Sequence, residues 1–273
     1  MSRYNACASP SRPSACRSVA FAAALLATAL AAAPVLAGGP VRDLATCQRL
    51  AETAPAQALF ETREWLAQGG AREAKLCRAA ALFHSGDFAA AGQAFEELVT
   101  AGAGESDRQI ANLLDRAAWA WVRAGDTVRA DQLYTKALAR LPDDGELRID
   151  RGIARAEGKK YREAIEDFTG VLKRQPRRAD AYFYRAAAYR ALNDLKNALA
   201  DVEQSLRLKP GDAEAQVLRG TLRALGGDAT GARLDWRDVI KREPESASAK
   251  EAAENLTRLD QAQAKGGQGK AKP

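Results

Sequence analysis

Four prolines recur at an interval of 34 residues, at positions 142, 176, 210 and 244. Each follows a helix-forming stretch and precedes a short polar turn, as in "ARLPDDGEL" and "RLKPGDAEA". Proline cannot continue a helix, because it lacks the backbone N–H and its ring clashes with the preceding turn. A helix-ending residue at a constant interval therefore fixes the length of a repeated unit. A period of this length is typical of a solenoid, in which each unit packs only on its neighbours.

Other positions within the period also keep their size. When the proline is numbered 32, the last four units are 111–144, 145–178, 179–212 and 213–246, and residues 72–105 form an earlier unit without the proline. Positions 8 and 20 are Gly or Ala, and position 24 is large in most units, as in Tyr134, Phe168 and Trp236. Gly- or Asn-containing turns divide each unit into two helices, because these residues tolerate the left-handed backbone that ends a helix.

This pattern resembles that of the tetratricopeptide repeat family over residues 72–246. The resemblance implies an all-α fold, a right-handed α-solenoid of about five helix pairs. Position 11 is aromatic in the family and is Trp121 and Tyr189 in two units, but it is Arg155 and Arg223 in two others. We therefore expect less apolar packing between the helices of some units.

The ends of the chain predict caps for this solenoid, since terminal units must cover an open apolar face. Residues 38–71 predict a helix pair, with Pro55 at a helix start and Gly69-Gly70 at its end. The solenoid is expected to span 72–264 and to finish with a closing helix that begins at Ser246 or Ser248. Residues 265–273 are rich in Gly and Lys and predict a disordered basic tail.

The first 37 residues are typical of a secretory signal peptide. Arg3, Arg12 and Arg17 precede an acid-free apolar run, 19–33, which is shorter than the roughly 20 residues of a membrane span. We expect cleavage after Ala37 and an exported, periplasmic protein without membrane insertion; an uncleaved anchor helix is the alternative. Cleavage removes three arginines and lowers the net charge from +6 to +3, so nucleic-acid binding is not expected.

Two of the four cysteines, Cys47 and Cys77, remain after this cleavage. Export to an oxidising compartment predicts a disulfide between them, and two buried free thiols are the alternative. In the fold that the resemblance implies, the helices that carry them are neighbours, so the disulfide would hold the N-terminal helix pair to the first repeat.

An arginine at position 7 and an aspartate at position 23 recur together in the last three units. We expect each pair to form charge-assisted hydrogen bonds across the seam between the two helices of a unit, with a structural role. The pairs are Arg151 with Asp167, Arg185 with Asp201, and Arg219 with Asp235.

The chain carries no catalytic motif that we can identify. It has one histidine, His84, at a predicted helix end, and no paired C-x-x-C, H-E-x-x-H, G-x-S-x-G or phosphate-binding loop. We therefore expect no enzyme activity, no cofactor and no metal site.

The resemblance instead implies a concave groove lined by the first helix of each unit. Aromatic residues and arginine are enriched at the residues that dominate protein–protein binding energy. We expect a non-enzymatic protein-binding module that holds a peptide or partner protein as a scaffold or assembly factor of a bacterial cell envelope. The alternatives are a self-associating structural protein and a regulatory subunit of a separate envelope enzyme. The residues predicted to line the groove are Phe83, Arg116, Trp119, Arg123, Ile149, Phe183, Tyr184 and Arg190.

Overall fold

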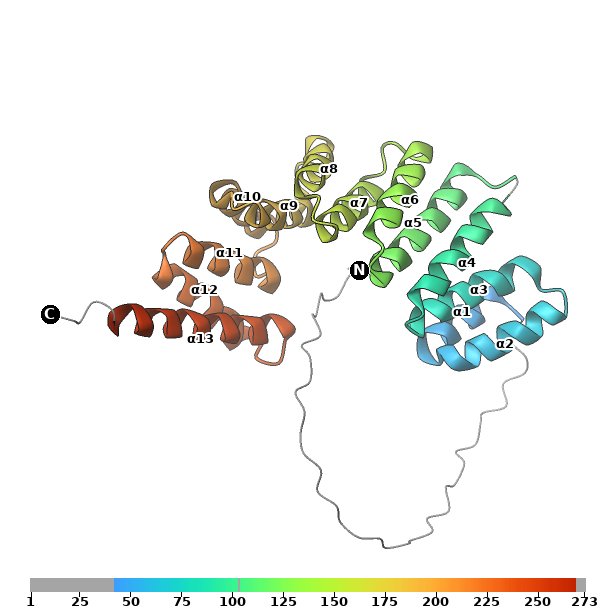
Figure 1. The fold of residues 1–273 in the computed structure, drawn as a ribbon, viewed down its shortest axis with the longest axis horizontal. Coiled ribbons are helices and arrows are strands. Elements are labelled where there is room, and N and C mark those ends of the chain that lie inside the picture. Colours follow the sequence, from blue (N-terminus) through green and yellow to red (C-terminus); the bar gives the residue numbers. More distant parts are fainter. Residues whose placement is uncertain (1–41, 103, 269–273) are drawn as a thin grey trace, which may run out of the picture. The chain divides into compact units, whose positions relative to one another are not determined.

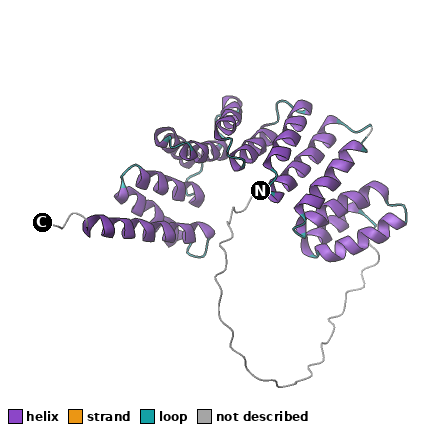
Figure 2. Ribbon diagram, in the orientation of Figure 1, coloured by secondary structure: helices purple, strands orange, loops and turns teal. Residues whose placement is uncertain are grey.

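The computed structural model describes residues 42–102 and 104–268, without the side chains of 265–268. The predicted signal peptide therefore lies outside the described residues. Within these ranges every regular element is a helix, and no strand is present (Figure 2). The all-α prediction is confirmed.

Successive helices form antiparallel pairs along the chain (Figure 1). The N-terminal pair is α1 (Leu44–Thr53) and α2 (Pro55–Ala67). The repeats follow as α3 (Ala71–His84) with α4 (Phe88–Thr100), α5 (Asp107–Ala124) with α6 (Thr127–Arg140), α7 (Gly145–Glu157) with α8 (Tyr161–Arg174), α9 (Ala179–Ala191) with α10 (Leu195–Leu208), and α11 (Ala213–Leu225) with α12 (Ala229–Arg242). The last helix is α13 (Ala247–Gln268).

The turns follow the sequence with one exception. The second helices α6, α8, α10 and α12 each end two residues before a proline of the period. Between paired helices, Gly125, Gly227 and Asn193 adopt positive φ values of 86°, 90° and 60°. In the unit 145–178, however, Lys159 rather than Gly158 takes the left-handed conformation, with φ 61°. The turn geometry belongs to the position in the repeat, and a non-glycine residue there accepts the strain.

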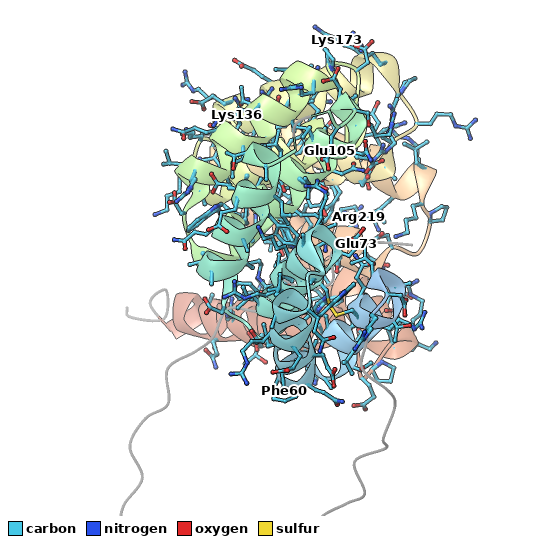
Figure 3. All side chains as sticks on the ribbon, turned by 90° about the vertical axis from the view of Figure 1, so that its right-hand side faces the viewer. Phe60, Glu73, Glu105, Lys136, Lys173 and Arg219 are labelled. Carbon is cyan, nitrogen blue, oxygen red and sulfur yellow. A yellow bond between two sulfur atoms is a disulfide. The ribbon has the colours of Figure 1, made fainter. Side chains whose placement is uncertain are left out.

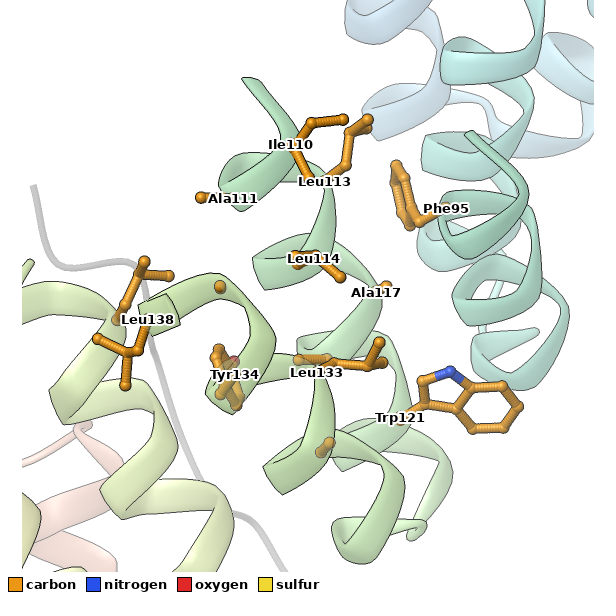
Figure 4. Packing of buried hydrophobic residues seen from close by; sticks show 14 of the residues in the cluster. Phe95, Ile110, Ala111, Leu113, Leu114, Ala117, Trp121, Leu133, Tyr134 and Leu138 are labelled. Carbon is orange, nitrogen blue, oxygen red and sulfur yellow. The ribbon is translucent and has the colours of Figure 1, made fainter. Parts of the chain in front are cut away.

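Small residues bring the two helices of a unit close together. A Cβ atom added to Gly152 on α7 would lie 2.6 Å from the ring of Phe168 on α8, and one on Gly220 would lie 2.5 Å from the indole of Trp236. Phe168 and Trp236, the residues at position 24, are buried at these contacts. Figure 4 shows the larger cluster around α5, where Leu114 and Trp121 of α5 pack with Phe95 of α4 and Tyr134 of α6.

The core is divided along the chain into clusters that each join neighbouring helix pairs. Besides the contacts between consecutive helices, α5 touches α7, α7 touches α9, α9 touches α11, and α11 touches α13. The first helices of successive units are therefore neighbours, as in a solenoid of helix pairs. This arrangement brings residues 34 positions apart to one surface.

The closing helix covers the last repeat and is longer than expected. Ser246 caps it by accepting a hydrogen bond from the Ala249 N–H at 3.0 Å, and Ala249 and Ala252 pack in a cluster with Trp236 and Val239. The helix continues to Gln268, so the expectation that residues 265–268 are disordered is wrong, while 269–273 lie outside the described residues. Residues 261–265, "QAQAK", are strong helix formers, and the helix continues past them to Gln268.

Candidate partner-binding site

The predicted arginine–aspartate pairs form in all three units. Arg185 donates from Nε and Nη2 to the two carboxylate oxygens of Asp201, at 2.7 and 2.8 Å. Arg151 and Asp167 make the same two-bond contact at 3.0 and 2.6 Å, and Arg219 and Asp235 do so at 3.0 and 2.5 Å. The three aspartates are buried. Bidentate geometry of this kind fixes the register of two helices.

The arginines that depart from the aromatic pattern at position 11 belong to the same network. Arg155 donates to Asp167 at 2.8 Å, and Arg223 donates to Asp235 at 2.9 Å. Position 11 lies one helical turn after position 7, so both arginines face the same carboxylate. These two arginines therefore extend the polar network of the seam. The aromatic pattern at position 11 does not predict this role.

The network also crosses between units. Arg151 Nη1 donates to the hydroxyl of Thr135 on the preceding α6 at 3.2 Å, and Arg185 Nη1 donates to Thr169 on α8 at 2.9 Å. Asp131 on α6 accepts hydrogen bonds from Arg155 and Lys160, each at 2.9 Å. The units 145–178 and 179–212 are therefore each linked to the previous unit by polar contacts as well as by apolar packing.

Burial and hydrogen bonding act in opposite directions on the pKa values of this network. Hydrogen bonds to Asp201 raise the pKa of Arg185 despite the opposing effect of burial. Burial raises the pKa of Asp131, but hydrogen bonds from Lys160 and Arg155 outweigh it, so the pKa lies below 3.8. Arg185 and Asp131 are therefore each held in the charged form, as expected of members of ion pairs that support the fold.

Cys47 on α1 and Cys77 on α3 form the predicted disulfide, with Cα atoms 5.9 Å apart. Both residues are fully buried. The bond holds the N-terminal helix pair against the first helix of the first repeat.

Most residues predicted to line the groove are at least partly exposed on first helices. Phe83 on α3, Arg116 and Trp119 on α5, and Phe183 and Tyr184 on α9 are half-buried, and Arg123 and Arg190 are exposed. We call these residues the first-helix surface.

Aromatic rings contact arginine side chains and one another on this surface. The guanidinium of Arg116 lies 4.4 Å from the ring centroid of Phe95, and that of Arg123 lies 4.7 Å from that of Phe88. Phe183 and Tyr184 meet edge to face with their ring centroids 5.3 Å apart. Such contacts limit the freedom of the side chains, which lowers the entropy lost on binding a partner.

Ile149 does not belong to this surface. It is only 3% exposed and packs in a core cluster with Phe168 and Val171 of α8. Ile149 lies where α7 meets α9 of the next unit, and residues of α9 such as Ala181 belong to the same cluster and help to cover it. The prediction that Ile149 lines a groove is wrong for this reason.

The described residues contain no group of three or more His, Cys, Asp or Glu side chains placed to hold a metal ion. None of their helices is both long and apolar enough to cross a bilayer.

Among the hollows of the described residues, two lie near the first helices, and neither was predicted from the sequence. The larger, of 540 Å³, lies over the turn between α6 and α7, where Arg140 is paired with Asp107 and Arg178 with Glu146. The smaller, of 220 Å³, lies between α3 and α5 and is lined by Arg72, Leu76, Glu105, Gln109, Asn112, Leu113 and Arg116. The only signal for the second was the break in the 34-residue period before α5, since Glu105 and Gln109 flank or lie within that insertion.

Comparison with known proteins agrees with this architecture. A family model described as tetratricopeptide repeat matches residues 149–213 and 188–248. Tetratricopeptide repeat protein 36 of Danio rerio is 34% identical over 110 residues, which cover 39% of this chain and 57% of that protein. DnaJ homolog subfamily C member 3 of Mus musculus is 27% identical over 136 residues, which cover 50% of this chain and 27% of that protein. The chain thus spans little more than half of one curated relative and about a quarter of the other.

Solved structures share the fold at low sequence identity. A tetratricopeptide repeat protein from Parabacteroides merdae superposes with a TM-score of 0.59 at 18% identity, covering 79% of this chain and 84% of that one. MamA from Desulfovibrio magneticus gives a TM-score of 0.54 at 18% identity, covering 62% and 93%. Residues 149–248 therefore match the tetratricopeptide repeat model, and the stack of helix pairs has the fold of these solved structures.

Proposed function

We propose that this protein is a non-enzymatic binding module that holds a peptide segment or a partner protein against the first-helix surface. One observation carries the proposal: from α5 to α11 the first helices of successive units touch, and α3, α5 and α9 carry the half-buried Phe83, Arg116, Trp119, Phe183 and Tyr184. Half-buried aromatic and arginine side chains are the residue types that dominate binding energy in protein interfaces. A surface that combines them suits a partner with apolar and acidic groups.

The names of matched relatives support a role among other proteins. Hsp70-Hsp90 organizing protein 1 of Glycine max is 31% identical over 85 residues, which cover 31% of this chain and 15% of that protein. Its name describes a protein that organises two others. By analogy, the repeats of this chain would bring a partner into an assembly.

We further propose that the protein acts as an exported scaffold or assembly factor of a bacterial cell envelope. The signal-like segment before Ala37 supports export, and the Cys47–Cys77 disulfide suits an oxidising compartment. N-terminal sequencing of protein recovered from the periplasmic fraction tests this directly. We expect the chain to begin at Gly38; recovery of the intact chain from the cytosol would contradict export.

Site-specific photo-crosslinking tests the binding surface in the full chain. A benzoylphenylalanine placed at Trp119 or Phe183 should give partner adducts, because both residues lie on the first-helix surface. Lys136 on α6 and Lys173 on α8 are exposed on second helices and serve as matched controls (Figure 3). Adducts at the control positions with none at 119 or 183 would overturn the proposal. Adducts that contain only a second copy of this chain would instead establish self-association.

A further inference from the structure

The 220 Å³ cleft between α3 and α5 differs from the rest of the first-helix surface in its chemistry. Its walls carry the apolar Leu76 and Leu113 together with two arginines, a glutamate and two side-chain amides. Pockets for small organic ligands occupy about 300–1,000 Å³. This cleft is smaller, so it suits a single side chain of a larger partner better than a free cofactor or metabolite.

Arg116 contributes a half-buried positive charge to the cleft, with the carboxylate of Asp115 as its neighbour in the chain. Its guanidinium rests on the face of Phe95, at 4.4 Å from the ring centroid. Burial lowers the pKa of Arg116, and the neighbouring Asp115 raises it in part. A desolvated guanidinium that has an aromatic ring on one side gains most from a carboxylate on its open side.

The other cation of the cleft, Arg72 on α3, is already occupied. It forms an ion pair with Glu105, which belongs to the segment between α4 and α5. The Glu105 N–H donates to the Gly102 carbonyl oxygen at 3.1 Å, and a Cβ atom at Gly102 would lie 3.1 Å from Glu105 Oε2. The turn and the absence of a side chain at Gly102 therefore bring the carboxylate inward.

Glu105 is an imperfect occupant of the cleft. Its Oε2 atom is buried and has no hydrogen-bond partner. A buried acceptor without a donor is unfavourable by about 1–3 kcal/mol. The pair formed with Arg72 is thus weaker than one in which both carboxylate oxygens accept hydrogen bonds.

We propose that this cleft receives the carboxylate of an internal aspartate or glutamate of a partner segment, which binds Arg116 and competes with Glu105 for Arg72. The inference rests on the proposed function, and it specifies the chemistry of the partner and an internal competitor for it. Asn112 is exposed at the cleft with an amide that can both donate and accept, and Gln109 adds an amide N–H, since its Oε1 accepts from Ser106 in the cap of α5. Amides of this kind match the N–H and C=O groups of a main chain that continues past the acidic residue.

A displayed library of random 12-residue peptides provides a test that does not require the natural partner. Selections are run on the full-length wild type, Arg116→Gln, Glu105→Gln and Arg237→Gln. Arg237 is an exposed arginine on α12 and controls for the loss of one positive charge. Circular dichroism and thermal unfolding of each variant establish that it is folded before selection.

Enrichment of an acidic residue at one internal position is expected on the wild type and on Arg237→Gln, and its loss is expected on Arg116→Gln. One selected peptide, acetylated and amidated, is then measured with its Glu and with Gln in its place. The Glu-to-Gln change should weaken binding to the wild type about tenfold or more, since hydrogen bonds to charged groups are the stronger ones. The same change should have little effect on Arg116→Gln, and Glu105→Gln should bind the acidic peptide several-fold more tightly.

The outcomes distinguish failure of the cleft proposal from failure of the proposed binding function. Selected peptides that bind the first-helix surface with no acidic preference, or with a preference that Arg116→Gln keeps, would overturn the cleft while leaving the binding module intact. Preference for a free C-terminal carboxylate over the amidated internal Glu would also overturn it. Failure of any peptide to be enriched on any folded variant would count against the proposed function itself.

Discussion

Gly152 shows how closely the two helices of a repeat approach one another. A methyl group there would meet the Phe168 ring at 2.6 Å, a separation that requires the ring or the backbone to move. Overpacking of a core costs about 1–3 kcal/mol, whereas alanine is favoured over glycine in a helix by about 1 kcal/mol. We therefore expect Gly152→Ala to lower the free energy of unfolding by up to about 2 kcal/mol, measured by urea denaturation.

Gly170 on α8 is the matched control for this change. A Cβ atom there would lie 3.3 Å from the flexible side chain of Arg148, which can move aside. Gly170→Ala should therefore keep the helix-propensity gain and stabilise the protein by up to about 1 kcal/mol. Equal effects of the two substitutions would show that helix propensity, and not the close approach, decides the outcome.

The buried carboxylate of Asp201 should matter most when its partner remains. Asp201→Ala removes a buried carboxylate and leaves the half-buried Arg185 without its counterion, and we expect a loss of about 3–5 kcal/mol. Replacing both residues, as Arg185→Met with Asp201→Leu, should recover most of that loss, because an apolar pair of similar size avoids the unpaired charge. An unchanged midpoint of unfolding for Asp201→Ala would contradict the seam.

Asp131 predicts a dependence of stability on pH with a defined sign. Its pKa is lower in the folded protein than its ordinary value of 3.8, so the folded state favours the ionised form. The stabilisation is present above the unfolded pKa and is lost as the pH falls through the folded value. The difference in unfolding free energy between wild type and Asp131→Asn should shrink as the pH falls from 5 to about 3. A constant difference over that range would show that the charge of Asp131 is not involved.

At the level of elements, the disulfide decides how firmly the N-terminal helix pair is attached. It closes a segment of 30 residues, and on the chain-entropy estimate such a loop contributes about 3–4 kcal/mol. Reduction should therefore raise amide hydrogen exchange in α1, α2 and α3 while leaving α8 to α12 unchanged. Cys47→Ala with Cys77→Ala should reproduce the effect without reductant, and uniform loss of protection along the chain would contradict a local role.

The helix pairs and the arginine–aspartate seam could be predicted from the sequence because each depends on spacing within one repeat. Prolines and turn residues set where helices end, and a constant offset between Arg151 and Asp167 recurs in the next two units. Burial between units was harder to foresee. Ile149 is covered by a neighbouring helix, and Arg155 faces a carboxylate that its own position in the pattern does not indicate. The cleft beside Glu105 depends on an insertion that has no counterpart in the other repeats.

At the scale of the whole molecule, stability should be distributed along the stack, because each core cluster joins only neighbouring units. Deleting residues 247–273 removes α13 and uncovers Val217, Trp236 and Val239, which are buried beneath it. Exchange should rise in α11 and α12 and remain unchanged in α5 to α7. A collapse of protection in every repeat would show that the chain unfolds as a single cooperative block.

The same modular construction places the binding residues on a surface that runs along the chain. The first helices supply side chains from different units, and the seam and the apolar clusters hold those helices in register. The aromatic and arginine residues of the first-helix surface are not members of the arginine–aspartate seam, although Phe183 and Tyr184 also pack against core clusters.

Hydrogen–deuterium exchange of the full chain with and without a selected peptide tests this account most directly. We predict that the peptide slows exchange in the first helices α3, α5 and α9, and leaves the second helices α8 and α10 at their free rates. Protection confined to the second helices, with none in α5 or α9, would contradict the claim that the first helices form the binding surface.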